Sequence, residues 1–323
     1  MEDPSLTTFL PSPKLPPELE QPIFEIAAFS DPKTAVCLLR VSRALHEWIG
    51  SFTYRTIAHH LPIPRGTSGK RYPDLAWYQR YGKFVRHLLL SLSVTDEIAP
   101  FLACCPHIED LAIWGPESPP DMDKILGVLT ELKTRPIIHL TELSTTIESL
   151  FAVAHRQSTH EHGTVPSDDD PPRSAFPFQF SIALGQHPIL KHITHLELLD
   201  PCQAWEIYTG LASIPNLTHL CVSSWADRRF ILGALKNCHH LEALVLMKLL
   251  TLAEMEDGEG CRLVDQDNIQ GEFQLFEGQS ELGIERIVEV GVVYPHYWVN
   301  AAKGSKSMWM FADEVIEERR GRK

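Results

Sequence analysis

The chain has 323 residues, 44% of them apolar and 22% charged, which is an ordinary composition for a globular protein long enough for about two domains. Its net charge of −13 argues against non-specific binding to nucleic acid, because such binding needs clustered Lys and Arg side chains on the phosphates. No apolar run approaches the roughly 18–20 residues that span a bilayer, and residues 1–8 lack the pattern of a signal peptide.

The cysteines bear on the compartment. There are seven, an odd number, and they are dispersed without any C-x-x-C motif. Such usage is typical of a reducing environment. We therefore expect a cytoplasmic and/or nuclear protein that has neither a membrane nor a nucleic acid as its partner.

The N-terminal part predicts a small helical bundle. Residues 1–14 contain three prolines and few apolar side chains, so we expect a disordered lead-in. Residues 15–57 carry apolar side chains at helical spacing in three short segments. The second segment begins at Asp31-Pro32, a capping residue followed by a first-turn proline. Prolines and glycines then predict a linker at residues 58–74.

Residues 75–323 contain an internal repeat. Apolar residues spaced as L-x-x-L-x-L return at an offset of 24 residues and, in an earlier pair, of 23 residues. The five triples are Val85, Leu88 and Leu90; Ile108, Leu111 and Ile113; Ile193, Leu196 and Leu198; Leu217, Leu220 and Val222; and Leu241, Leu244 and Leu246. This period lies within the range of leucine-rich repeats.

The spacing predicts a strand in each repeat. The last two apolar residues of a triple lie on one face of a strand, because side chains alternate along it. Stacked repeats share a core, and helices at 96–104 and 226–237 return the chain between strands. A strand at 287–293 and an amphipathic helix at 308–316 complete the predicted domain, with the helix as its cap.

The residues between the leucines are expected to face an open, concave surface. That surface is chemically mixed and carries no ordered set of acids, bases or ligands, so we interpret it as the place that holds a target protein. The predicted target contacts are His195, Glu197, Leu199, His219, Cys221, Ser223, Ala243, Val245 and Met247.

Two polar stretches, 156–174 and 253–283, are expected to be loop insertions, because they contain little to bury. His160, His162 and Asp168 belong to a set of side chains in or beside the first loop that are chemically adequate metal ligands. We interpret this stretch as a flexible polar loop rather than as a metal site. The cysteines Cys105 and Cys238 occupy the same place in two repeats and are interpreted as structural. We predict no metal, no cofactor and no catalytic residue, and therefore not an enzyme.

The first helical segments resemble an F-box, and the layout resembles fungal F-box-like proteins with C-terminal leucine-rich repeats. The residues that carry the resemblance are Leu15-Pro16-Pro17-Glu18-Leu19, Ile23-Phe24, Ile26, Ala35, Leu38, Val41-Ser42-Arg43, Trp48 and Tyr54. The sequence thus predicts an α/β protein: a short N-terminal three-helix F-box-like bundle, then an irregular leucine-rich-repeat solenoid with a parallel sheet over residues 75–323, capped by a C-terminal helix.

The resemblance implies a non-catalytic substrate receptor of a cullin-based, SCF-type ubiquitin ligase. The bundle would dock on a Skp-family adaptor, and through it on a cullin, while the repeats hold a target that the sequence does not identify. The implied adaptor contacts are Leu15, Pro16, Leu19, Ile23, Phe24, Ile26 and Leu38.

Two other interpretations stay open. Pro22 departs from a regular helix interior, so the first helix is expected either to begin regularly only at Pro22 or to kink there. In a repeat scaffold that has lost adaptor binding, the bundle would only cap the solenoid. In a third interpretation, a hydrolase or metalloenzyme would use the histidine-rich loop at 156–174.

Overall fold

The computed structural model describes residues 15–59, 75–91, 98–114, 140–146, 150, 184–187, 189–200, 202–203, 205–250, 284–293 and 296–321. The chain divides into two compact units, residues 1–55 and 56–323, which are described separately below as the bundle and the repeat domain. The expected lead-in at 1–14 and the two expected loops at 156–174 and 253–283 lie outside the described residues. No helix in the described part of the chain is long and apolar enough to cross a membrane.

The bundle consists of three helices in mutual contact, α1 (Pro17–Ser30), α2 (Pro32–Leu38) and α3 (Arg43–Thr53). The predicted start of the second helix is confirmed, because the Asp31 carboxylate accepts hydrogen bonds from the backbone N–H groups of Lys33 and Thr34. The Ser42 hydroxyl caps α3 in the same way by accepting from Leu45 N–H at 3.1 Å. Each helix therefore begins where its own sequence provides a cap or a first-turn proline.

The core of the bundle is small. Its buried residues are Ala28, Ala35 and Ile49, with three half-buried side chains packed against them. The helix α1 runs from Pro17 through Pro22, so the alternative in which it begins only at Pro22 is wrong. So few buried side chains make a bundle of this size marginal without a partner.

The repeat domain is built on one parallel sheet of eight strands that follow one another in sequence order. The strands are β1 (Thr56–His59), β2 (His87–Ser91), β3 (Asp110–Trp114), β4 (Glu142–Thr145), β5 (His195–Leu198), β6 (His219–Ser223), β7 (Ala243–Leu250) and β8 (Ile287–Val293). The strands predicted from the repeat triples and at 287–293 are confirmed.

The register of the sheet places the leucines of successive repeats side by side. One row crosses the sheet from Ile57 through Leu88, Leu111, Leu143, Leu196, Leu220 and Leu244 to Ile287. Because side chains alternate along a strand, this row defines one face of the sheet, called here the core face. All members of the row from β2 to β8 are buried in the main hydrophobic core.

Short helices and 3-10 turns cover the core face. The helices are α4 (Leu75–Tyr81), α5 (Ile98–Ala103) and α8 (Arg228–Asn237), the last two as predicted. The 3-10 turns are η1 (Gly82–Phe84), η2 (Leu184–Gln186), η3 (Leu190–His192), η4 (Trp205–Ile207), η5 (Thr209–Ser213) and η6 (Ile284–Arg286). They contribute large apolar side chains to the core, among them Tyr78, Leu102 and Phe230. The close approach of α8 to η4 requires Gly233, because a Cβ there would lie 2.0 Å from Cγ of Trp205.

The sheet differs from the prediction at its first and fourth strands. The strand β1 lies where the end of the bundle (15–57) and the start of the linker (58–74) were expected, so these boundaries are wrong by a few residues. The strand β4 begins at Glu142, outside the predicted repeat triples. Neither strand carries a complete L-x-x-L-x-L triple, so the repeat pattern does not predict them.

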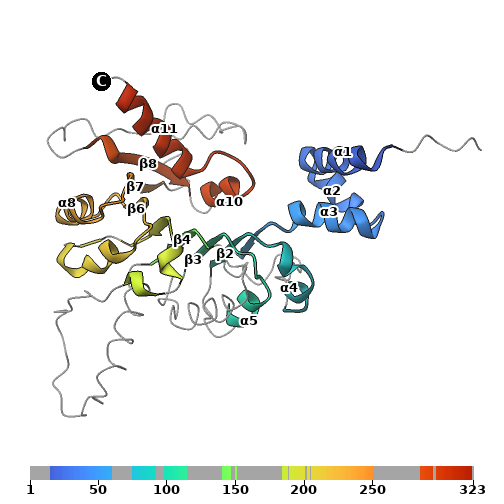
Figure 1. The fold of residues 1–323 in the computed structure, drawn as a ribbon, viewed down its shortest axis with the longest axis horizontal. Helices are drawn as coiled ribbons and strands as arrows, with labels where there is room; N and C mark the ends of the chain where they lie inside the picture. Colours follow the sequence, from blue (N-terminus) through green and yellow to red (C-terminus); the bar gives the residue numbers. More distant parts are fainter. Residues whose placement is uncertain are drawn as a thin grey trace, which may run out of the picture. The chain divides into compact units, whose positions relative to one another are not determined.

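Two helices, α10 (His296–Ala302) and α11 (Met308–Gly321), lie against the opposite face of the sheet, called here the second face (Figure 1). In the view of Figure 1 they lie on the other side of the strands from α4 and α5. The helix α11 was expected to cap the end of the solenoid. That expectation is wrong, because α11 packs on the face of β7 and β8 and reaches over β5 and β6.

The leucine row generates a stability prediction. Replacing Leu220 by Ala is expected to lower the free energy of unfolding of the repeat domain by about 2–5 kcal/mol, because it opens a cavity at a fully buried position. The measurement is urea unfolding followed by circular dichroism. Leu75→Ala is the matched control, since Leu75 is 37% exposed; equal losses for the two variants would contradict the assignment of the core face.

Candidate functional site

The bundle presents an apolar surface on α1. Leu19, Ile23 and Ile26 are 50%, 44% and 67% exposed, and their spacing of four and three residues places them on one face of the helix. Phe29, at the end of the same helix, is 73% exposed. Exposed apolar side chains that gather in this way mark an interaction surface more often than scattered ones do.

The predicted adaptor contacts divide into two groups. Leu15, Pro16, Leu19, Ile23 and Ile26 are exposed. Phe24 and Leu38 are half-buried and pack against the small core of the bundle. The structure thus brings five of the seven predicted residues to the surface, while the other two also hold the helices together.

The second face of the sheet is covered by residues 296–321, called here the strap. In α10, Trp298 and Ala302 are buried in a cluster with Leu89 and Ala112 of β2 and β3. At the far end of α10, the Thr56 hydroxyl of β1 donates a hydrogen bond to the carbonyl oxygen of Ala302 at 2.9 Å. The strap therefore begins its cover at the first strands of the sheet.

The second half of the strap covers the last strands. Met308, Trp309, Ala312 and Ile316 of α11 are buried in one cluster with apolar side chains of β6, β7 and β8. Its far end is held by the Arg319 guanidinium, which donates to the carbonyl oxygen of Ile287 at 2.5 Å. The cover thus extends from β1 to β8.

The strap lies over the predicted target contacts. The prediction of an open concave surface is wrong, because the strap removes that surface from solvent in this structure. Seven of the nine residues, Glu197, His219, Cys221, Ser223, Ala243, Val245 and Met247, are buried, and His195 and Leu199 are half-buried. Their assignment to a target stays a prediction.

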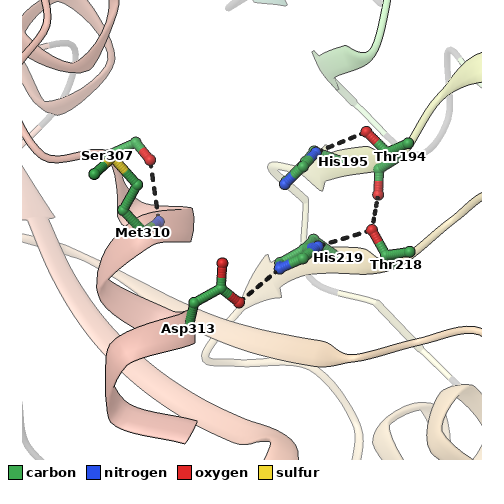
Figure 2. Close-up of polar contacts among 7 residues, drawn as sticks. All are labelled: Thr194, His195, Thr218, His219, Ser307, Met310 and Asp313. Atoms are coloured by element: carbon green, nitrogen blue, oxygen red, sulfur yellow. Dashed lines mark hydrogen bonds and ion pairs between the residues drawn. The ribbon is translucent and has the colours of Figure 1, made fainter. Parts of the chain in front are cut away.

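A ladder of histidines and threonines runs beneath α11 (Figure 2). His195 and His219 occupy equivalent positions in neighbouring strands, and their rings stack with centroids 4.3 Å apart. Each imidazole Nδ1 lies 2.8 Å from the hydroxyl of the preceding threonine, Thr194 or Thr218. Nε2 of His219 lies 2.9 Å from the Asp313 carboxylate, which joins the ladder to the strap.

Burial shifts the pKa of a histidine in this ladder. It lowers the pKa of His195 to about 4, and the neighbouring His219 lowers it further, while the Asp313 carboxylate acts in the opposite direction. His195 is therefore neutral at pH 7. The ladder also sits against Trp309, whose ring centroid is 5.1 Å from that of His195.

Three carboxyl groups lie under the middle of the strap. Asp110, Glu142 and Glu197 come from β3, β4 and β5 and line one cavity of about 30 Å³ together with Tyr297, Trp309 and other strap residues. Burial raises the pKa of Glu142 and of Glu197 to about 7 and also raises that of Asp110. Nearby carboxylates raise these values further, and hydrogen bonds oppose the shift.

The strap meets these acids with neutral donors. The Tyr297 hydroxyl donates to Glu197, and the Trp298 indole N–H donates to Asp110 at 3.3 Å. A hydrogen bond with Trp309 favours the ionised form of Glu142. His87 lies 3.5 Å from Asp110 and is the basic side chain paired with this group of acids.

The arrangement does not form a recognisable catalytic site. Thr218, His219 and Asp313 follow the hydroxyl–imidazole–carboxylate order of some hydrolases. However, Thr194 and His195 repeat the same contact one strand earlier without the carboxylate, and the Thr218 hydroxyl lies 3.2 Å from the carbonyl oxygen of Thr194 as its acceptor. We therefore interpret the ladder as packing between repeats.

The other candidate chemistry is also structural or falls outside the described residues. Burial raises the pKa of Cys105 and of Cys238 to about 12, which agrees with inert packing residues rather than nucleophiles. Within the described residues, no group of three or more His, Cys, Asp and Glu is placed to hold a metal ion. The histidines and aspartates of the loop at 156–174 lie outside that part of the chain.

Sequence reasoning missed the strap and the acids Asp110 and Glu142. One signal could have found them. The residues facing the strap in β7 and β8, which include Val245, Val288 and Val290, are as apolar as those facing the core. Strands that are apolar on both faces are typical of a sheet covered on both sides.

A scan against protein-family models finds no match to this chain, and a search of curated proteins finds none either.

The buried glutamate generates a pH prediction. Glu197→Gln is expected to raise the free energy of unfolding by roughly 3 kcal/mol at pH 8, because one unit of pKa shift corresponds to about 1.4 kcal/mol. In the folded chain the pKa of Glu197 is about 7, above its ordinary value of 4.5. Burial of this carboxyl therefore lowers the free energy of unfolding above pH 7 and lowers it progressively less as the pH falls from 7 to 4.5. Below pH 4.5 its ionisation makes no contribution.

Urea unfolding of the variant and the original chain at pH 8 and pH 4.5 measures this difference. The contribution of His195 cancels, since both chains carry it. Glu317→Gln, at an exposed position of α11, is the control and is expected to change little at either pH. A gain from Glu197→Gln that is the same at both pH values would contradict the burial of an ionisable group there.

Proposed function

We propose that this chain is a non-catalytic interaction protein, the substrate receptor of a cullin-based, SCF-type ubiquitin ligase. Its F-box-like bundle docks on a Skp-family adaptor, and its leucine-rich-repeat solenoid holds a target protein. The observation that carries the proposal is the exposed apolar face of α1, formed by Leu19, Ile23 and Ile26.

The chemistry of that face supports docking on a protein. Its side chains are large and aliphatic, and each one removed from water contributes about 1.5–3 kcal/mol when fully buried. Leu15 and Pro16, which immediately precede α1, are also exposed. The described part of the bundle buries few apolar side chains, namely Ala28, Ala35, Leu45 and Ile49, so it gains stability when a partner covers this surface.

The repeat domain supports the second half of the proposal. Eight parallel strands in sequence order, with one leucine row running across them, are what stacked leucine-rich repeats produce. Such a domain provides a rigid frame on which target-binding residues are fixed. The receptor would act as a tether, which raises the effective concentration of the target near a ubiquitin-charged enzyme.

The adaptor contact is tested by co-purification. The full chain is expected to capture a Skp-family adaptor in a one-to-one complex, and the double change Leu19→Ala and Ile23→Ala is expected to weaken capture at least about 100-fold, since each truncation removes about 1.5–3 kcal/mol of burial. Both side chains are at least 44% exposed, so the variant is expected to keep its fold.

Trp225→Ala is the matched control, because Trp225 is 79% exposed but belongs to the repeat domain. It is expected to leave capture unchanged. Failure of the folded original chain to bind any Skp-family adaptor would contradict the proposal. The chain would then be a repeat scaffold whose bundle covers its apolar face within the molecule.

A further inference from the structure

The attachment of the strap to the sheet differs from the attachment of the strands to one another. Neighbouring strands share ladders of backbone hydrogen bonds. The backbone hydrogen bonds described for residues 296–321 all stay within the strap, for example from Lys303 to Val299. Between the described parts of strap and sheet, the hydrogen bonds all involve side chains, such as His219 with Asp313. Lifting the strap therefore breaks no ladder bond between these described parts.

The surface beneath the strap is more polar than the surface on the core face. Among the described residues, six polar or charged side chains are buried, and five of them lie on the second face: Asp110, Ser144, Glu197, His219 and Ser223. The core face instead carries the leucine row. Buried polar groups cost free energy unless they are fully paired, so closing the strap is opposed by the residues that it covers.

The negative charge of the acids beneath the strap is not fully matched by positive charge. Asp110, Glu142 and Glu197 are met largely by indole and phenol donors, and burial shifts the pKa of each carboxyl upward. Water would hydrate all three in an open form. A cavity of about 30 Å³ lies along this seam, between the three acids and the strap.

Apolar contacts hold the strap at two places. Trp298 anchors α10 over β2 and β3, and Trp309 belongs to the cluster over β6, β7 and β8. Between these anchors lie the three carboxyl groups. The strap is thus fixed by a few large side chains on either side of an unfavourable middle section.

From these features, we propose that the strap opens from the second face as a unit while the sheet beneath it stays folded. In the closed form, the strap is an autoinhibitory contact that withholds the second face from other proteins. Opening does not depend on adaptor docking. Its consequence for target binding rests on the proposed function, because the withheld residues are the predicted target contacts.

The chain contains its own probes of this opening. Cys221 is fully buried on the second face, with its Sγ 3.7 Å from Sδ of Met308 in the strap. Cys105, Cys202 and Cys238 are similarly buried, but in the core on the other side of the sheet. Of these four thiols, strap opening exposes only that of Cys221, whereas global unfolding exposes all four.

The experiment measures alkylation of the full chain by N-ethylmaleimide under native conditions, with each cysteine followed by peptide mass spectrometry. Cys221 is expected to react at least about tenfold faster than the three core thiols, because local openings cost less free energy than global unfolding. Low urea concentrations are expected to accelerate its reaction less than that of the core thiols, since strap opening exposes less surface than global unfolding.

Two variants sharpen the test. Trp309→Ala removes an anchor of the strap and is expected to accelerate Cys221 further without changing the core thiols. Asp313→Asn, which weakens the contact with His219, is expected to act in the same direction; Glu314→Gln is its matched control, because Glu314 pairs with Lys306 inside the strap.

A common rate for all four buried thiols in the original chain, rising equally for all four in Trp309→Ala, would overturn the proposal. The strap would then be an integral layer that separates from the sheet only on global unfolding. Neither outcome involves the adaptor, so failure of this inference is distinguishable from failure of the proposed function.

Discussion

The repeat domain depends on the burial of both faces of one parallel sheet. A leucine row fills one face, and Val245, Val288 and Val290 make the other face apolar over the last strands. Parallel sheets that are apolar on both faces are usually found covered on both sides. Short return helices cover the core face, and α10 and α11 cover the second face. The positions of the strap tryptophans and the burial of the acids both follow from that requirement.

The cover on the second face is uneven because the sheet beneath it is uneven. Toward β7 and β8 the strap meets aliphatic side chains, but across β3, β4 and β5 it meets Asp110, Glu142 and Glu197. Burying carboxyl groups without a matching cation opposes closure. A surface selected only to lie under helices would not need them. The second face therefore combines an apolar part, which holds the strap, with a polar part, which opposes it.

Much of this fold follows from local chemistry in the sequence. The L-x-x-L-x-L triples predict where strands lie, because period-two alternation and a fixed repeat length leave few alternatives. Asp31-Pro32 likewise marks a helix start. By contrast, β1 is four residues long and belongs to no triple, and α10 has seven residues without clear periodicity. Short elements such as these are fixed by the neighbours on which they pack.

The candidate surfaces were predictable to different degrees. The exposed face of α1 follows from helical spacing alone, whereas the burial of His195, Glu197 and His219 does not. Whether these side chains are buried depends on a segment about 100 residues further along the chain, as the separation of Glu197 from Tyr297 illustrates. Alternation shows which face a residue occupies, but only the tertiary structure shows what covers that face.

Hydroxyl-radical footprinting of the full chain tests the covered second face most directly, because neighbouring oxidisable side chains of the strap differ sharply in exposure. In the strap, Met310 is 55% exposed, whereas Met308, Trp309 and Trp298 are at most 9% exposed; Trp225, outside the strap and 79% exposed, serves as a reference. We expect rapid oxidation of Met310 and Trp225 and strong protection of the other three while the strap is closed. Oxidation of Met308 and Trp309 as fast as that of Met310 would contradict the account, because α11 would then not rest on the sheet.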